Sequence, residues 1–559
     1  MSYLFNCLSE EDQEFHHIKN TAADFYRANR VPEELEVALA EAFFQNPEDV
    51  YGYLANHFTK LSSAPLISRL QAKDVYDSRG QLCVEAEVVC VICNEEKSVS
   101  SAAISSQLGQ KETGVDWQAN IEERERHVMT AVQWITEHLC KMLEKHDPCD
   151  QSQVDQKLSD FFIARDLEER EIRKKMEEEM MSVTEQEVEI PPSPPDKKKD
   201  KKKKKGNASE KPFCPAEPPE PVLPGCLAIG SVSLAVAKAG AQINGVPLYK
   251  YIRMLKNPED QDNFHIPLSL VTLLRCGKTC PGKLKLLEEV LLIPKAGHQV
   301  KQIITMAMQM QQEIMRILNT SGKGGAIQAV ASDSGVIPLN FDRPEQALDL
   351  ISEACNNLAL SLGTEIHLAV NCAAHDLMDY VKEKYEIATG VFKSPDELVA
   401  MYQTLVNKYT AVVAFIDPFR REDADQWEKL SNVMGDSCSL LSDITYKPQA
   451  PPLPGVRGRL LKHVNEITVS DLIRISAEEQ GSLIFGTVSN DACSDDSMAD
   501  IAVGLGVDYV KVGGLWSGER MTKYNRLACI EEELARQGSL VSKEEYPPPL
   551  LIETTQAEE

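Results

Sequence analysis

The residues with the clearest potential for chemistry lie near the C-terminal end of the chain. Ser489, Asn490 and Asp491 follow a short apolar run, and Lys511 lies inside a second apolar run, Tyr-Val-Lys-Val. A buried lysine costs free energy unless it is paired or used for binding, although a lysine at a strand end can also extend its ammonium to water. These four residues are therefore candidate contacts of a ligand.

The segments around these residues alternate between strand and helix patterns. Apolar runs at 484–488 and 509–512 are each followed by a helical pattern, at 497–505 and 517–536. Strand, helix, strand, helix is the repeat of a parallel sheet or barrel. In an α/β barrel, functional residues lie at the C-terminal ends of the strands, so the candidate residues should share one rim.

Four stretches of the sequence, in one order, resemble the enolase family. VKVGGLWSGERMTKYNRLACIEEEL, from position 510, is similar to the enolase lysine, small-residue turn and SER-x-x-KYN pattern. KDVYDSRGQLCVE at 73–85 resembles the opening strand with its D-S-R-G turn, the helix at 224–252 ends in GVPLY, and VAFIDPF at 413–419 resembles a strand ending in E-D-P-F. The resemblance implies an α/β fold class: an enolase-type N-terminal α+β domain followed by an eight-stranded α/β (TIM-like) barrel.

The resemblance also implies a reaction. Enolases are glycolytic lyases that dehydrate 2-phosphoglycerate to phosphoenolpyruvate. A lysine base removes the proton next to the carboxylate, two Mg²⁺ ions neutralise the resulting charge, and a glutamic acid helps the hydroxyl group to leave. Such a site needs three carboxylate metal ligands, a pair of carboxylates and a set of Arg, Ser and His side chains. Mg²⁺ is therefore the cofactor that the family implies.

Several family positions are retained. By resemblance, Lys511 binds the substrate carboxylate, Glu289 is one of the carboxylate pair that acts in catalysis and substrate binding, and Ser489 contacts the substrate. Asp443 matches the third metal ligand, and Ser78 of the D-S-R-G turn matches a ligand of the second metal. These residues favour a working enolase.

Two neighbouring residues compete for the position of the base. Alignment on the following Val-Asn pair places His463 at the family lysine, whereas a shift of one residue places Lys462 there. Neighbours on a strand face opposite sides, so only one of them can point into the barrel. We favour Lys462, because the Leu-Leu-Lys order is kept.

Two metal-ligand positions are altered. The family's first Asp has become Asn371, and the Glu of E-D-P-F has become Ile416, which has no donor atom. A hard divalent cation requires anionic oxygens. Asp417 follows Ile416 directly, so strand alternation predicts that its side chain points away from the site.

The acid and phosphate positions are altered as well. The family's catalytic Glu of G-D-E-G-G is Ser334, and its His-Arg pair is Asn490-Asp491. A phosphate that meets a carboxylate instead of a guanidinium loses several kcal/mol at an effective dielectric constant of about 20. The chain is therefore interpreted as a weakened enolase, or as a non-catalytic enolase-fold scaffold, with a related reaction on another acid as a third alternative.

The composition restricts the class of protein. The chain has 559 residues and a net charge of −27, which argues against nucleic acid or an anionic membrane as the main partner. No secretory signal begins the chain, and no apolar run approaches the ~20 residues of a membrane span. The 15 scattered cysteines are typical of reduced thiols. We expect a cytoplasmic protein.

Residues 1–66 are predicted to form a helical extension. An amphipathic pattern begins at Pro32, and a second helix is predicted to begin after Asn46 with Pro47 in its first turn. The pair resembles docking-and-dimerisation helices of the regulatory-subunit type, although a helical cap on the main body is an alternative. The resemblance implies a homodimer, as enolases also form, or an anchoring-protein helix bound at 1–66, and hence a place in a cilium or flagellum.

The remaining segments follow from composition and resemblance. Residues 67–164 should form the α+β domain, 165–222 a charged, Lys- and Pro-rich insertion, 223–540 the barrel and 541–559 a disordered tail. Strand-like runs within the barrel segment lie at 290–293, 327–330, 366–370, 411–416, 439–441, 459–461, 483–488 and 509–512.

Overall fold

The structure is a computed structural model of the whole chain. It describes residues 10–541, except for 106–116, 187–221, 260–261, 279, 281, 321–334, 337, 446–449, 479–480 and 488–494. The chain divides into two compact units, one of residues Met1–Leu66 with Val91–Lys97, and one of the remaining residues. Within the described residues, no helix is long and apolar enough to cross a membrane.

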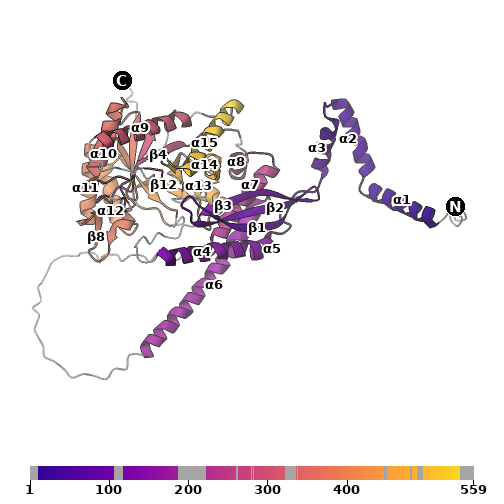
Figure 1. Ribbon diagram of the computed structural model, residues 1–559, viewed down its shortest axis with the longest axis horizontal. Helices are drawn as coiled ribbons and strands as arrows, with labels where there is room; N and C mark the ends of the chain where they lie inside the picture. Colours follow the sequence, from indigo (N-terminus) through magenta and orange to yellow (C-terminus); the bar gives the residue numbers. More distant parts are fainter. Residues whose placement is uncertain are drawn as a thin grey trace, which may run out of the picture. The chain divides into compact units, whose positions relative to one another are not determined.

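The smaller unit contains three helices, drawn in indigo in Figure 1: α1 (Glu10–Ala28), α2 (Val31–Gln45) and α3 (Val50–Leu61). Pro32 lies in the first turn of α2, where its missing N–H costs nothing. The predicted cap of the next helix is wrong. Asp49, rather than Asn46, caps α3, since its carboxylate accepts a hydrogen bond from the Gly52 N–H at 2.9 Å. Pro47 therefore lies before the helix.

A three-stranded sheet and a set of helices precede the barrel. The sheet has the order β1 (Leu66–Tyr76), β2 (Leu82–Ile92), β3 (Glu95–Ser105). The helices are α4 (Trp117–Gln133), a π-helical segment (Trp134–Leu139), α5 (Cys140–Leu143) and α6 (Gln151–Gln186). Near its start, α6 buries Val154 and Leu158, whereas Leu167, Ile172 and Met176 further along it are exposed.

Eight strands close into a barrel in the second half of the chain. Their bounds are β4 (Leu268–Leu274), β5 (Glu289–Pro294), β6 (Ile366–Asn371), β10 (Val412–Ile416), β11 (Ser439–Asp443), β12 (Val456–Lys462), β13 (Ser482–Gly486) and β14 (Tyr509–Gly513). Every predicted run except 327–330 coincides with a barrel strand, and 327–330 lies outside the described residues. β4 was not predicted, although all seven of its residues are buried.

Helices precede or separate most of these strands and cover the barrel (Figure 1). They are α7 (Leu227–Ile243), α8 (Leu248–Lys256), α9 (Val300–Thr320), α10 (Pro344–Asn357), α11 (Pro395–Lys408), α12 (Ala424–Met434), α13 (Val469–Glu478), α14 (Ser497–Leu505) and α15 (Gly518–Gln537). A short sheet of β7 (Met378–Asp379), β8 (Lys384–Ala388) and β9 (Val391–Lys393) follows β6.

The direction of one strand determines which residues meet at the rim. β5 runs antiparallel to both β4 and β6, while the other neighbours in the barrel are parallel. The first residue of β5, Glu289, therefore lies beside the last residue of β6, Asn371, with which it is paired in register. The start of β5 and the ends of the other strands thus form one barrel mouth.

Candidate active site

The first cluster in the barrel mouth is centred on Glu289. Lys511 of β14 is 8% exposed, and its Nζ lies 2.7 Å from Oε2 of Glu289. Nδ2 of Asn371 donates to the same oxygen at 3.0 Å, and the hydroxyl of Thr272 donates to Oε1 at 3.4 Å. Burial by itself would raise the pKa of Glu289, but the Lys511 ammonium and these hydrogen bonds lower it to about 2. The buried lysine is therefore paired with an ionised carboxylate.

The second cluster joins Lys462, the last residue of β12, to Asp443, the last residue of β11. Nζ of Lys462 lies 2.7 Å from Oδ2 of Asp443. The other carboxylate oxygen accepts the Thr445 N–H at 2.9 Å. Burial would raise the pKa of Asp443, but the Lys462 ammonium lowers it below its ordinary value. Two lysines, each paired with an acid from another strand, therefore face the mouth.

Asp417 also lies in this cluster, so the prediction that it points away from the site is wrong. Strand alternation ends at Ile416, because Asp417 has a φ of 46° and thus the left-handed conformation. Its Oδ1 accepts the Asp443 N–H at 3.0 Å. Burial and the Asp443 charge raise the pKa of Asp417 to about 7. A non-glycine residue held in this conformation costs about 1–3 kcal/mol, and such residues cluster at functional sites.

His463 lies on the opposite side of its strand end from Lys462. Its Nε2 lies 2.9 Å from the carbonyl oxygen of Ile467, and burial lowers its pKa to about 4. The ring lines a small cavity of about 60 Å³ that also contacts Asp495 and Lys523. Of the two candidate bases, Lys462 is therefore the one that contacts the carboxylates of the mouth.

The residues present do not fit the magnesium site that the family implies. Ile416 is fully buried and has no donor atom. Asn371 uses both of its amide atoms, because Nδ2 binds Glu289 and Oδ1 accepts the Ala373 N–H at 3.2 Å. In the part of the chain that the structure describes, no three His, Cys, Asp or Glu side chains form a group that could hold a metal ion. Asp443, which is paired with Lys462, and the neighbouring Asp417 supply fewer anionic oxygens than Mg²⁺ requires.

The remaining predicted residues are only partly placed. Ser78 lies in the turn after β1, where the Asp77 carboxylate accepts the N–H groups of Arg79 and Gln81 at 2.9 and 2.8 Å. Its buried Oγ has no hydrogen-bond partner among the described residues, so no hydrogen bond links it to Asp443. The other predicted positions lie outside the described residues: Ser334, Ser489, Asn490 and Asp491.

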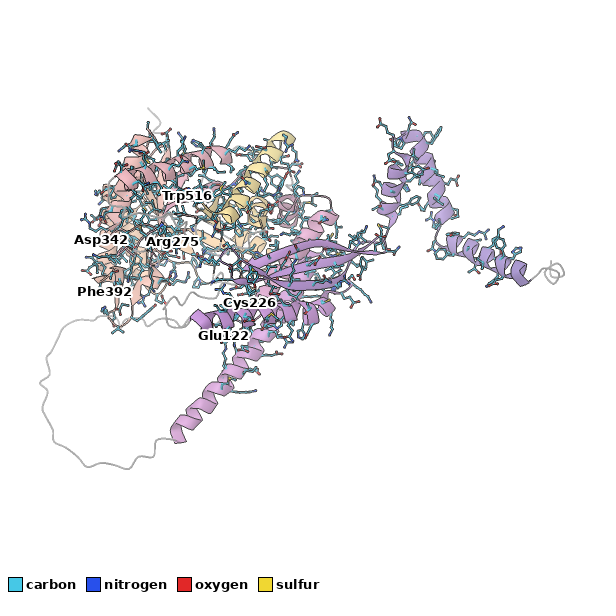
Figure 2. The ribbon with its side chains drawn as sticks, viewed as in Figure 1. Glu122, Cys226, Arg275, Asp342, Phe392 and Trp516 are labelled. Carbon is cyan, nitrogen blue, oxygen red and sulfur yellow. The ribbon has the colours of Figure 1, made fainter. Side chains whose placement is uncertain are left out.

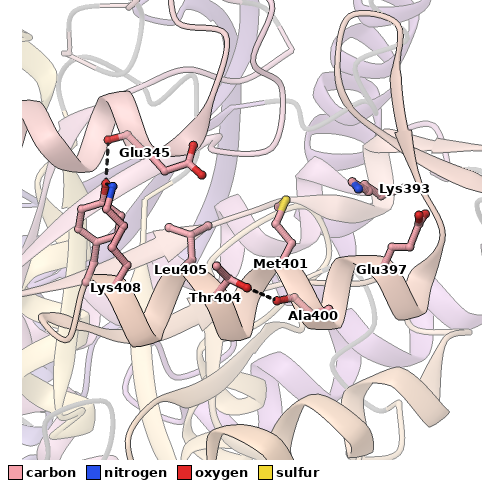
Figure 3. A pocket seen from close by; sticks show the side chains of 9 residues that line it. Glu345, Lys393, Glu397, Ala400, Met401, Thr404, Leu405 and Lys408 are labelled. Atoms are coloured by element: carbon pink, nitrogen blue, oxygen red, sulfur yellow. Dashed lines mark hydrogen bonds between the residues drawn. The ribbon is translucent and has the colours of Figure 1, made fainter.

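A larger hollow lies on the outer helices rather than in the mouth. It has a volume of about 340 Å³ and is lined by residues from α10 and α11 and by Lys393 of β9 (Figure 3). Two of its hydroxyl groups bind backbone carbonyls: Thr404 donates to Ala400 at 2.8 Å, and Tyr409 to Glu345 at 3.3 Å. Its residues have none of the paired lysines of the mouth, so the mouth is the better candidate active site.

Comparison with known proteins agrees with this geometry. Residues 263–546 match the family described as "Enolase, C-terminal TIM barrel domain". A Danio rerio protein named Enolase 4 is 45% identical over 541 residues, which cover 94% of this chain and 93% of that protein. Proteins of the same name are 42% identical in Xenopus laevis (96% of this chain, 95% of that protein) and 42% identical in Homo sapiens (96% and 91%). With its closed barrel and paired lysines at the mouth, this chain belongs to the enolase family.

Proposed function

We propose that the barrel mouth catalyses the enolase reaction, the dehydration of 2-phosphoglycerate to phosphoenolpyruvate, at a rate well below that of a complete site. The observation that carries the proposal is the pair of lysines, Lys462 and Lys511, each 2.7 Å from a carboxylate at the same rim. Family membership supports the same reaction class. The altered acid and metal positions are the reason for expecting a low rate.

Each retained residue has a defined task in this proposal. Lys511 exchanges Glu289 for the substrate carboxylate, which places the adjacent C–H group near Lys462. Lys462 first loses its ammonium proton to solvent, then accepts the proton from that carbon, and Asp443 stabilises the ammonium that forms again. Glu289 is ionised and cannot protonate the leaving hydroxyl, so this group takes its proton from solvent and departs as water, which is a further reason for a low rate. In the complete family site, Mg²⁺ supplies the charge neutralisation that the donor set here does not provide.

The test is phosphoenolpyruvate formation by the purified full-length chain, followed by its ultraviolet absorbance. We expect slow turnover that is lost in Lys462→Ala and Lys511→Ala, and that changes little when a chelator replaces Mg²⁺. Lys408→Ala is the matched control, because Lys408 is an exposed lysine on the outer helix α11. The proposal would be contradicted if the wild-type chain showed no turnover, or if the Lys462 and Lys511 variants turned over the substrate as fast as the wild-type chain.

The smaller unit favours a second function, an anchored scaffold. Among its described side chains, the buried apolar ones in the helices are Ala38 and Ala42, whereas Phe43, Phe44 and Tyr51 are 81%, 83% and 86% exposed. Helices that expose such large apolar side chains gain free energy when a partner covers them. We propose that α1–α3 pair with a second copy, and that the resulting dimer docks an amphipathic helix of an anchoring protein, in a cytoskeletal or flagellar structure.

Light scattering of the full chain tests the scaffold proposal. A variant with Phe43→Ser and Phe44→Ser should shift the mass from dimer towards monomer if these helices supply the contact. A wild-type chain that is monomeric at all concentrations would refute the dimer. A dimer that the double variant leaves unchanged would assign the contact to the barrel unit instead.

A further inference from the structure

A third ion pair lies at the barrel mouth and has no task in the proposed reaction. Arg275 directly follows β4, and Glu288 directly precedes β5. Nε of Arg275 lies 2.8 Å from Oε1 of Glu288, and Nη2 binds the same oxygen. The two side chains are only 17% and 22% exposed. Figure 2 labels Arg275 within the barrel unit.

The backbone around this pair is shaped to accommodate it. A Cβ atom on Gly277 would lie 1.6 Å from Oε2 of Glu288, so the glycine leaves room for the carboxylate in the position that it occupies. The Leu339 N–H donates to the carbonyl oxygen of Arg275 at 3.0 Å, and the Trp516 N–H donates to that of Gly335 at 3.0 Å. Gly335 thereby binds the segment that follows β14, and Leu339 binds the segment that follows β4.

Lys511 contacts the Glu289 carboxylate directly, and Arg275 lies at the end of β4, the strand paired with β5, on which Glu289 lies. Burial raises the pKa of Glu289 and Lys511 lowers it, and the Arg275 charge adds to the lowering. Arg275 uses Nε and Nη2 for Glu288, while Nη1 makes no hydrogen bond to any described residue. The Arg275 guanidinium therefore has donor capacity left over, and its partner Glu288 is the chain neighbour of Glu289, which pairs with the lysine that is proposed to bind the substrate carboxylate.

We propose that Arg275 binds the phosphate of a phosphorylated hydroxy acid whose carboxylate binds Lys511, and that Glu288 occupies the guanidinium when no ligand is present. The inference rests on the proposed function for the role of Lys511. A guanidinium binds phosphate through two parallel hydrogen bonds, which an ammonium cannot do. The family arginine is replaced by Asp491, so the phosphate needs another cation, and Arg275 supplies one from a different strand.

Calorimetric titration of the full chain with 2-phosphoglycerate, and separately with glycerate, tests this role. Arg275→Gln should weaken 2-phosphoglycerate binding about tenfold or more, as expected for the loss of charge-assisted hydrogen bonds, and leave glycerate binding within about twofold. Glu288→Gln should tighten 2-phosphoglycerate binding, because it removes the competing carboxylate. Arg526→Gln is the control: it breaks a similar pair with Asp500, between α15 and α14.

The direction of the Glu288→Gln effect separates ligand binding from a purely structural pair. If the pair only holds β4 and β5 together, both substitutions should lower the melting temperature and weaken binding alike, and the inference is overturned. It is also overturned if Arg275→Gln changes affinity by less than about twofold. If Arg275→Gln does not fold, Arg275→Lys takes its place, with weaker binding expected because the bidentate contact is lost. If 2-phosphoglycerate binding depends on Arg275 but the chain shows no turnover, the proposed dehydration is refuted and this inference stands. If the chain turns over 2-phosphoglycerate but Arg275→Gln leaves the affinity unchanged, this inference is refuted and the proposed dehydration stands.

Discussion

Replacement of Asp417 by Asn should remove a pH dependence from the stability of the barrel. Asn has nearly the same size, keeps the oxygen that accepts the Asp443 N–H at 3.0 Å, and tolerates a φ of 46° better than most residues. The substitution removes a carboxyl group whose pKa is raised to about 7 by burial and by the charge of Asp443. The substitution therefore removes the titrating proton and leaves the packing of the side chain nearly unchanged.

The sign of the effect follows from where the proton binds. The folded chain keeps the Asp417 proton up to about pH 7, whereas the unfolded chain releases it near the ordinary pKa of 3.8. The stability that this proton contributes is complete below the lower value and is lost as the pH rises to the higher one. The interval from 3.8 to about 7 corresponds to about 4 kcal/mol, since one pKa unit is worth about 1.4 kcal/mol. Partial exposure of the side chain reduces the expected effect to about 2–4 kcal/mol.

Urea unfolding of both chains at about pH 5 and about pH 8 measures this difference. Asp417→Asn should already be the more stable chain at the lower pH, because that pH lies above the unfolded pKa of 3.8, and its advantage should roughly double at the higher pH. Asp436→Asn, at a side chain that is 94% exposed, controls for the loss of a surface charge. Equal stabilities within about 1 kcal/mol at the higher pH, or a variant that is less stable at both, would refute the reasoning.

Three other experiments test separate parts of the structure. Lys511→Met should destabilise the fold by about 3–5 kcal/mol, because the buried Glu289 carboxylate loses its cation; a second change, Glu289→Gln, should restore the melting temperature but not turnover. Asn371→Asp combined with Ile416→Glu supplies two more anionic oxygens at the rim, so calorimetry should detect Mg²⁺ binding that the wild-type chain lacks; no heat of binding would contradict the donor-set argument. Asp49→Ala should cost α3 about 1 kcal/mol and speed its amide hydrogen exchange, whereas unchanged exchange would mean that the hydrogen bond to Gly52 contributes nothing.

Patterning located most of the barrel because parallel strands with two buried faces form compact apolar runs. β4 was missed although it is as buried as the others and lies between Pro267 and Gly277, since the periodicity of a short continuous apolar run does not distinguish a buried strand from a buried helical segment. In the smaller unit, the sequence likewise left the start of a helix ambiguous. Asn46-Pro47 and Asp49 are both good start signals for a helix, and the side chain that reaches the free N–H groups is Asp49.

Residue identity was enough to recognise the family and to show which reactive groups remain, because a lysine, an asparagine or an isoleucine has the same donor atoms in any fold. Which of them meet depends on the direction of each chain segment at the rim. An antiparallel β5 places Glu289 beside Asn371, and the left-handed residue Asp417 turns back to Asp443. Lys462 rather than His463 faces the carboxylates, because the strand end presents only one of two neighbours to the mouth. These outcomes depend on backbone dihedral angles and strand pairing between residues far apart in the chain, which local spacing does not encode.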